Sequence, residues 1–129
     1  GYRVWVENGE RPLGGSIGER FEKIFELPVG EVYLNSIDRD GTGQGYDLYI
    51  LDDLQYTIPI PVIIAGGAGQ YYHLAEGLKD DRIDAVATAH LFNFVGDGLA
   101  KARFRLLEQG FSLGEWDIEK ARSLNNWQS

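Results

Sequence analysis

The chain has 129 residues, of which 43% are hydrophobic and 25% charged, and this composition is that of an ordinary globular domain. Its 20 acidic and 12 basic residues give a formal net charge of −8, which argues against a nucleic-acid-binding protein. It has no cysteine, which excludes disulfides and thiolate chemistry, and no apolar run near the ~18 residues that span a bilayer, so we expect a cytoplasmic protein with no membrane partner.

The first quarter of the chain predicts an extended segment and then an amphipathic helix. Residues 2–6 are rich in β-forming residues and end in a polar turn at 7–9. Ser16 and Glu19 have the spacing of a capping box. Apolar residues then recur with the period of a helix, at Ile17, Phe21, Ile24 and Phe25. This helix is expected to end before Pro28.

Strands and helices alternate over the rest of the chain. We expect strands at 31–37, 58–65 and 83–89, and helices at 46–54, 70–79 and 98–109, with one more helix from residue 114. Gly110 fits the position just after a helix. The run 58–65 is almost continuously apolar, which is typical of a strand buried on both faces. The pattern predicts an α/β protein with a parallel sheet and outer helices, forming one unit over residues 1–129.

Three loops follow the strands, and each has residues suited to ligand binding. They are Asp38-Arg39-Asp40-Gly41-Thr42, Gly66-Gly67-Ala68-Gly69 and the stretch that begins Ala89-His90. Ligands of parallel α/β folds bind at the C-terminal ends of the strands, where glycines let backbone N–H groups approach an anion. These loops therefore predict a phosphate site.

Each of these loops also allows an interpretation without a ligand. The glycines 66–69 equally fit a tight strand-to-helix turn, and Asp38 and Asp40 equally fit a role in capping turns. The imidazole of His90 could act as an acid or base, although we favour a role for its backbone N–H. His73 falls in a polar stretch of a predicted helix and is expected on the surface.

The strand at 31–37 alternates between two kinds of side chain. Glu31, Tyr33 and Asn35 share one face, which is expected to point into a barrel, and the alternate residues face the helices. Glu31 would then lie at the end of the strand opposite the ligand loops, either as a functional carboxylate or as an exposed strand start. The His, Asp and Glu residues show no metal-ligand spacing, so we expect no metal and no cofactor.

Three segments resemble the cyclase subunit of imidazole glycerol phosphate synthase. Residues 30–47 (GEVYLNSIDRDGTGQGYD) resemble its sixth strand and loop, 60–69 (IPVIIAGGAG) its seventh strand and phosphate loop, and 84–92 (DAVATAHLF) its eighth strand. The resemblance covers about residues 2–110, and the tail 111–129 is atypical. It implies a TIM (β/α)8 barrel, of which this chain would be about half, with parallel strands and outer helices.

The resemblance also implies a function and a set of residues that perform it. The enzymes of this family take ammonia from a glutaminase subunit and convert a phosphorylated ribonucleotide into imidazole glycerol phosphate and an aminoimidazole ribotide, in histidine biosynthesis. The residues that would bind one phosphate are Gly66, Gly67, Ala89 and His90. Asp40 and Gly41 would contact the substrate, Asn35 would line the pocket, and Glu31 would belong to an ammonia gate.

Some features depart from the family pattern. The two catalytic aspartates of the family lie at the ends of the first and fifth strands, and this chain begins just after the fifth, so we expect part of a barrel that is inactive alone. His90 replaces a small residue, and Asn93 replaces an imidazole or aromatic side chain. These changes resemble paralogues that are thought to supply ammonia for sugar modification in surface-polysaccharide synthesis. A further alternative is a non-catalytic half-barrel that binds phosphate and forms a homodimer through its open strand edges.

Overall fold

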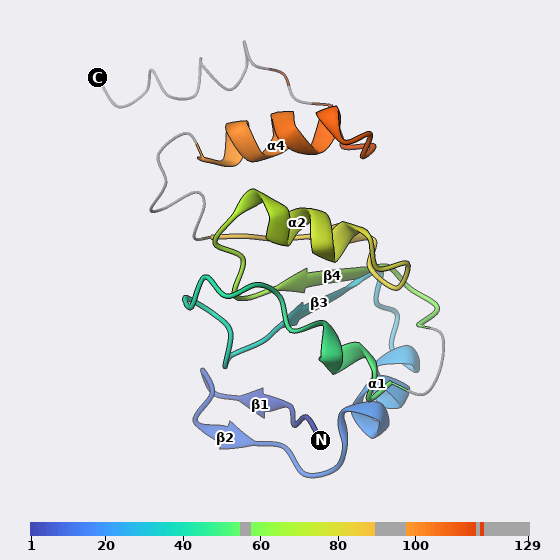
Figure 1. The fold of residues 1–129 in the computed structure, drawn as a ribbon. Coiled ribbons are helices and arrows are strands. Elements are labelled where there is room, and N and C mark those ends of the chain that lie inside the picture. Colours follow the sequence, from blue (N-terminus) through green and yellow to red (C-terminus); the bar gives the residue numbers. More distant parts are fainter. Residues whose placement is uncertain (55–57, 90–97, 116, 118–129) are drawn as a thin grey trace, which may run out of the picture.

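The computed structural model describes residues 1–54, 58–89, 98–115 and 117, and its centre is a parallel sheet (Figure 1). Strands β3 (Val32–Asn35), β4 (Val62–Ala65) and β5 (Ala85–Val86) lie side by side in that order. Both pairings are parallel, with Tyr33 opposite Ile63 and Ile63 opposite Ala85. The predicted α/β class with parallel strands is confirmed, although each strand is shorter than predicted.

Two prolines explain why β4 starts later than the predicted residue 58. Pro59 and Pro61 have no N–H to donate, so before Val62 only the Pro61 carbonyl joins the ladder, where it accepts a hydrogen bond from the Val32 amide at 2.9 Å. From there the strand is deeply buried, with Val62 and Ile64 each 1% exposed. The carboxylate of Asp84 accepts a hydrogen bond from the Val62 amide at 2.9 Å and so ties the start of β4 to the start of β5.

The side chains of β3 alternate as the sequence predicted. Val32 is buried, whereas Tyr33 is 60% exposed and Asn35 is exposed. The buried side belongs to a core formed with α1 (Ile17–Phe25) and with η1 (Leu48–Leu51), a 3-10 helix. The prediction of a helix over 46–54 is therefore wrong in length and type, since only one 3-10 turn forms.

Helix α1 begins with the predicted capping box. The Ser16 hydroxyl accepts a hydrogen bond from the Glu19 amide at 3.2 Å, and the Glu19 carboxylate accepts one from the Ser16 amide at 2.8 Å. Its apolar stripe is buried, since Ile17 and Phe21 are 3% and 2% exposed. The ring of Phe21 meets that of Phe25 edge to face, with centroids 5.9 Å apart.

Helices α2 (Tyr71–Leu78) and α4 (Gly98–Glu108) form a second layer, in which α2 lies between the sheet and α4 (Figure 1). Their shared core is the cluster of Leu74, Ala75, Ala102 and Leu106. The predicted C-terminal glycine is confirmed, because Gly110 has a φ of 85°. Its amide donates to the Leu107 carbonyl and the Phe111 amide to the Leu106 carbonyl, which is the hydrogen-bond pattern of a Schellman motif.

The N-terminal residues form a hairpin that the sequence predicted only in part. Strand β1 (Trp5–Val6) pairs antiparallel with β2 (Arg11–Pro12), and the predicted polar turn at 7–9 connects them. Two residues of this turn other than glycine, Glu7 and Asn8, have a φ of 56°. Residues 116 and 118–129, which contain most of the helix expected from residue 114, lie outside the described part of the chain.

None of the helices that the structure describes combines the length and apolar character needed to cross a membrane.

Candidate functional site

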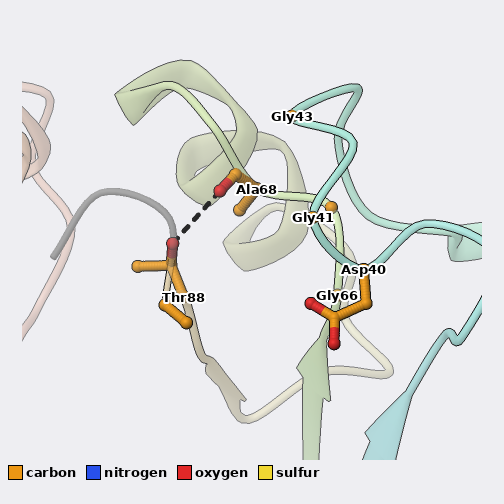
Figure 2. A pocket seen from close by; sticks show the side chains of 8 residues that line it. Asp40, Gly41, Gly43, Gly66, Ala68 and Thr88 are labelled. Atoms are coloured by element: carbon orange, nitrogen blue, oxygen red, sulfur yellow. Dashed lines mark hydrogen bonds between the residues drawn. The ribbon is translucent and has the colours of Figure 1, made fainter. Parts of the chain in front are cut away.

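A small pocket lies at the C-terminal edge of the sheet, where the loops after β3, β4 and β5 meet (Figure 2). Its volume is about 120 Å³, whereas pockets that enclose a drug-sized ligand span roughly 300–1,000 Å³, so it fits one anionic group rather than a whole ribonucleotide. The described residues that line it are Asp40, Gly41, Gly43, Gly66, Gly67, Ala68, Thr88 and Ala89.

The structure brings together five of the residues that the sequence singled out. Three of them, Gly66, Gly67 and Ala89, were predicted to bind phosphate, and the other two, Asp40 and Gly41, to contact substrate. They come from three separate loops, so only the parallel order of the strands makes them neighbours. Their roles as ligand-binding residues stay predictions.

Two other predicted residues, Asn35 and Glu31, are not among the described residues that line this pocket. Asn35 is exposed at the end of β3, with its side-chain oxygen 2.8 Å from the place where a Cβ on Gly66 would lie. Glu31 is exposed at the opposite end of the same strand. His90 lies outside the described residues, as does Asn93.

Sequence reasoning missed three lining residues, which are Gly43, Ala68 and Thr88. Ala68 stands inside one of the loops predicted to bind a ligand and Gly43 directly follows another, so their position in the chain was the available indication. Thr88 is a lone hydroxyl at the end of an apolar strand, and its Oγ1 donates a hydrogen bond to the Ala68 carbonyl at 3.1 Å (Figure 2).

Gly66 and Gly67 are required by the packing of the loops. Their φ angles are 87° and 99°, in the region that favours glycine. A Cβ on Gly66 would lie 2.6 Å from the Ser36 carbonyl oxygen, and one on Gly67 would overlap the carbonyl of Gly45. The tight-turn interpretation is therefore correct, and the same backbone also forms the wall of the pocket.

The hydrogen bonds around this turn use its carbonyls rather than its first amides. The Gly45 amide donates to the Gly67 carbonyl at 2.8 Å, and Thr88 donates to the Ala68 carbonyl. Within the described ranges, the amides of Gly66, Gly67 and Ala68 have no hydrogen-bond acceptor. Three consecutive free N–H groups beside a cavity are a typical means of binding an anion.

Asp40 is the one charged side chain among the described lining residues, and Figure 2 shows its carboxylate beside Gly66 at the end of β4. The loop that positions it closes on itself, because the Asp40 amide donates to the Ser36 carbonyl at 2.9 Å. The Thr42 hydroxyl also donates to the Arg39 carbonyl at 2.7 Å. The residues that line the pocket thus include three whose amides have no acceptor in the described chain and one carboxylate.

The expectation that His73 is a surface residue is wrong. It is 6% exposed, because the first turn of α2 packs against the loop that contains Gly45. Its Nδ1 accepts hydrogen bonds from the amides of Gly69 at 3.1 Å and Gln70 at 3.3 Å. A polar stretch of sequence did not reveal this, since the partners of the imidazole are backbone groups.

The groups whose pKa is clearly displaced serve the packing of the fold. Burial, followed by a 2.7 Å hydrogen bond to Asp47, raises the pKa of Tyr2 to about 12. Burial also raises the pKa of Tyr46, whose hydroxyl donates to the Ala87 carbonyl at 2.9 Å. Hydrogen bonds from Arg82 lower the pKa of Asp80. Neither these three side chains nor their partners Asp47 and Arg82 are among the described residues that line the pocket.

Comparisons with known proteins agree with the geometry. The sequence profile of the family described as "Histidine biosynthesis protein" matches residues 1–96. The putative imidazole glycerol phosphate synthase subunit hisF2 of Parasynechococcus marenigrum (strain WH8102) is 39% identical over 125 residues, which are 96% of this chain and 46% of the relative.

Two further relatives have the same relation to the chain. The imidazole glycerol phosphate synthase subunits HisF of Chloroherpeton thalassium and Chlorobaculum tepidum are 38% and 39% identical over 112 residues, which are 87% of this chain and 45% of each relative. The chain thus spans less than half the length of the relatives it matches. It belongs to the histidine biosynthesis protein family, resembles HisF subunits in sequence, and has the α/β fold of part of a TIM barrel.

Proposed function

We propose that the pocket binds one phosphate group of a phosphorylated ribonucleotide, and that the chain supplies this phosphate-binding part of an ammonia-dependent cyclase of histidine biosynthesis. The observation that carries the proposal is the row of free amides at Gly66, Gly67 and Ala68 beside the cavity. The names of the relatives, which are subunits of imidazole glycerol phosphate synthase, support the choice of substrate.

Backbone amides suit this chain better than cationic side chains would. No lysine or arginine is among the described residues that line the pocket, and the whole chain has a formal charge of −8. An anion must therefore be held by short-range N–H donors that point at it, and not by the general field of the protein. Such a site distinguishes anions by their shape, because the ends of the strands hold the backbone N–H donors in fixed positions.

The carboxylate of Asp40 adds a requirement for a second group on the ligand. A carboxylate beside a phosphate is repulsive unless a hydrogen-bond donor lies between them. A sugar hydroxyl adjacent to the phosphate meets that need, because it donates to the carboxylate while the amides hold the phosphate. We therefore assign the ligand to the phosphorylated sugars, of which a ribonucleotide is one.

The proposed reaction takes ammonia from a glutaminase partner and releases imidazole glycerol phosphate and an aminoimidazole ribotide, in the cytoplasm. Glu31 supports the direction of ammonia entry, since it lies at the end of β3 opposite the pocket. We propose that it belongs to an entrance for ammonia, that Asn35 lines the substrate pocket of the complete barrel, and that His90 adds its backbone amide to the phosphate site.

A second candidate function is a phosphate-binding half-barrel that associates with another copy of itself. The specific observation in its favour is the exposed face of β3, where the ring of Tyr33 is 60% exposed. The same pocket would then serve binding and not catalysis.

The proposal predicts that Gly67→Asp abolishes the binding of inorganic phosphate. The new side chain would enter a space already filled by the Gly45 carbonyl and Arg39, and it would place a negative charge at the site. Isothermal titration calorimetry of the 129-residue chain with inorganic phosphate measures the effect.

The matched control is Gly30→Asp. It introduces the same charge at an exposed glycine that has open space around its Cβ position and lies outside the described pocket lining. We expect the control to bind phosphate like the wild type. Equal affinities for wild type and Gly67→Asp would remove the site from consideration.

A further inference from the structure

His73 lies behind the wall of the pocket, in the first turn of α2, and contacts two of the three loops that form it. On one side, Nδ1 accepts hydrogen bonds from the amides of Gly69 and Gln70. Both bonds require a lone pair on Nδ1, so this nitrogen carries no proton in the structure. The ring thus fixes the last part of the glycine turn that begins at Gly66.

On its other side the imidazole packs against Gly45. A Cβ on Gly45 would lie 3.2 Å from Cδ2 and 3.5 Å from Nε2 of His73, and Gly45 has a φ of 96°. The amide of Gly45 in turn donates to the Gly67 carbonyl at 2.8 Å. Through this one contact the ring also sets the loop that follows β3, and with it the orientation of the Gly67 peptide.

These contacts divide the amides of the turn into two groups. Those of Gly69 and Gln70 are used by the imidazole, whereas the described chain offers no acceptor to those of Gly66, Gly67 and Ala68. His73 does not itself line the pocket. The three amides that the imidazole does not use are therefore the ones of this turn that remain for an anion.

We propose that His73 is the positioning residue of the anion pocket, holding the glycine turn through its unprotonated Nδ1 so that the three free amides converge on a phosphate. The inference rests on the proposed function, because it presumes that the pocket binds phosphate. It assigns to His73 a role that is exerted through the backbone amides of Gly69 and Gln70. That role depends on Nδ1 as a hydrogen-bond acceptor and not on the size of the ring.

The test compares His73→Leu, which removes the acceptor, with His73→Asn, whose side-chain oxygen can occupy the place of Nδ1. We expect His73→Leu to weaken the binding of inorganic phosphate about tenfold or more, the effect that supporting residues around a bound ion typically have. His73→Asn should bind within about threefold of wild type. The measurement is an NMR titration of the glycine amides with inorganic phosphate.

Tyr49→Leu is the control for an unrelated side-chain truncation, because Tyr49 is 70% exposed on η1 and is not among the described residues that line the pocket. It should leave phosphate affinity unchanged. Amide hydrogen exchange supplies a second readout, in which Gly69 and Gln70 lose protection in His73→Leu and keep it in His73→Asn. A folded His73→Leu protein with wild-type affinity and wild-type exchange at these amides would overturn the inference.

Two further outcomes separate this inference from the function on which it rests. If the wild type fails to bind phosphate, the proposed function fails and the positioning role with it. If the wild type and His73→Leu bind equally, only the positioning role fails. Should His73→Leu not fold, the nitrogen chemical shifts of the His73 ring in the wild-type protein still decide, since a proton found on Nδ1 would contradict the proposal.

Discussion

The phenol of Tyr2 shows how a single residue couples folding to pH. Its pKa is raised from 10.0 to about 12 by burial and by the hydrogen bond to Asp47. A group whose pKa is higher in the folded protein stabilises the fold fully below its unfolded pKa, and this contribution is lost as the pH rises through the folded value. For Tyr2 the window is therefore about pH 10 to 12.

We predict that the free energy of unfolding falls less steeply between pH 10 and pH 12 in Tyr2→Phe than in the wild type. Urea unfolding at several pH values measures the slope. Tyr49→Phe is the control for loss of a hydroxyl, because Tyr49 is 70% exposed on η1. A Tyr2→Phe slope as steep as that of the wild type would show that folding does not raise the pKa of Tyr2.

For individual residues, the sequence revealed those that are fixed by their own backbone conformation. It did not reveal those that are fixed by hydrogen bonds made only in the folded chain. Gly66 and Gly67 were recognisable because a left-handed backbone after a buried strand favours glycine. His73 was misjudged because its partners are backbone amides of the preceding turn, which no pattern of side chains reveals. Thr88 was missed because its acceptor, Ala68, is twenty residues away.

Among the elements, the end of α4 allows a test of backbone conformation without a change in packing. A Cβ on either Gly110 or Gly114 would have open space around it, but only Gly110 has a positive φ, of 85°. We predict that Gly110→Ala lowers the free energy of unfolding by about 1 kcal/mol, because a left-handed alanine is strained.

The control is Gly114→Ala, which should change the free energy of unfolding by less than about 0.5 kcal/mol. Thermal or urea unfolding of both variants measures the difference. If the two substitutions were equal in effect, the hydrogen bonds of the Gly110 and Phe111 amides would not depend on the left-handed turn.

The helices and strands also show which elements a sequence can predict. The beginning of α1 was predictable, since Ser16 and Glu19 satisfy each other's amides within one turn. The strand β2 was not, because Arg11 and Pro12 have no β pattern and pair only through the turn before them. The predicted strands were too long because a strand ends where its pairing with β4 ends. The length of the apolar run in the sequence does not determine that point.

At the level of the whole molecule, the two faces of the sheet are unequal. One face is buried by α1 and η1, whereas the other has Tyr33 at 60% exposure, with Ile63 beside it in register. Within the described chain, β3 and β5 each have a neighbour on one side only. An exposed aromatic side chain on an open edge strand favours association with another sheet.

The relatives are more than twice as long as the matched segment, so their remaining residues are available to cover this face. For the 129-residue chain by itself we propose a second copy as the partner. Light scattering or sedimentation at micromolar concentration should then show a homodimer.

A charge on the open face should break this association. We predict that Tyr33→Lys weakens the dimer about tenfold or more, because burying an unpaired ammonium between two sheets is unfavourable and a buried tyrosine ring is lost. Tyr49→Lys is the matched control, since it makes the same change at a more exposed tyrosine on η1, and it should leave the dimer intact. A wild-type chain that sediments as a monomer, or a dimer equally stable in both variants, would show that the exposed face of β3 does not mediate assembly.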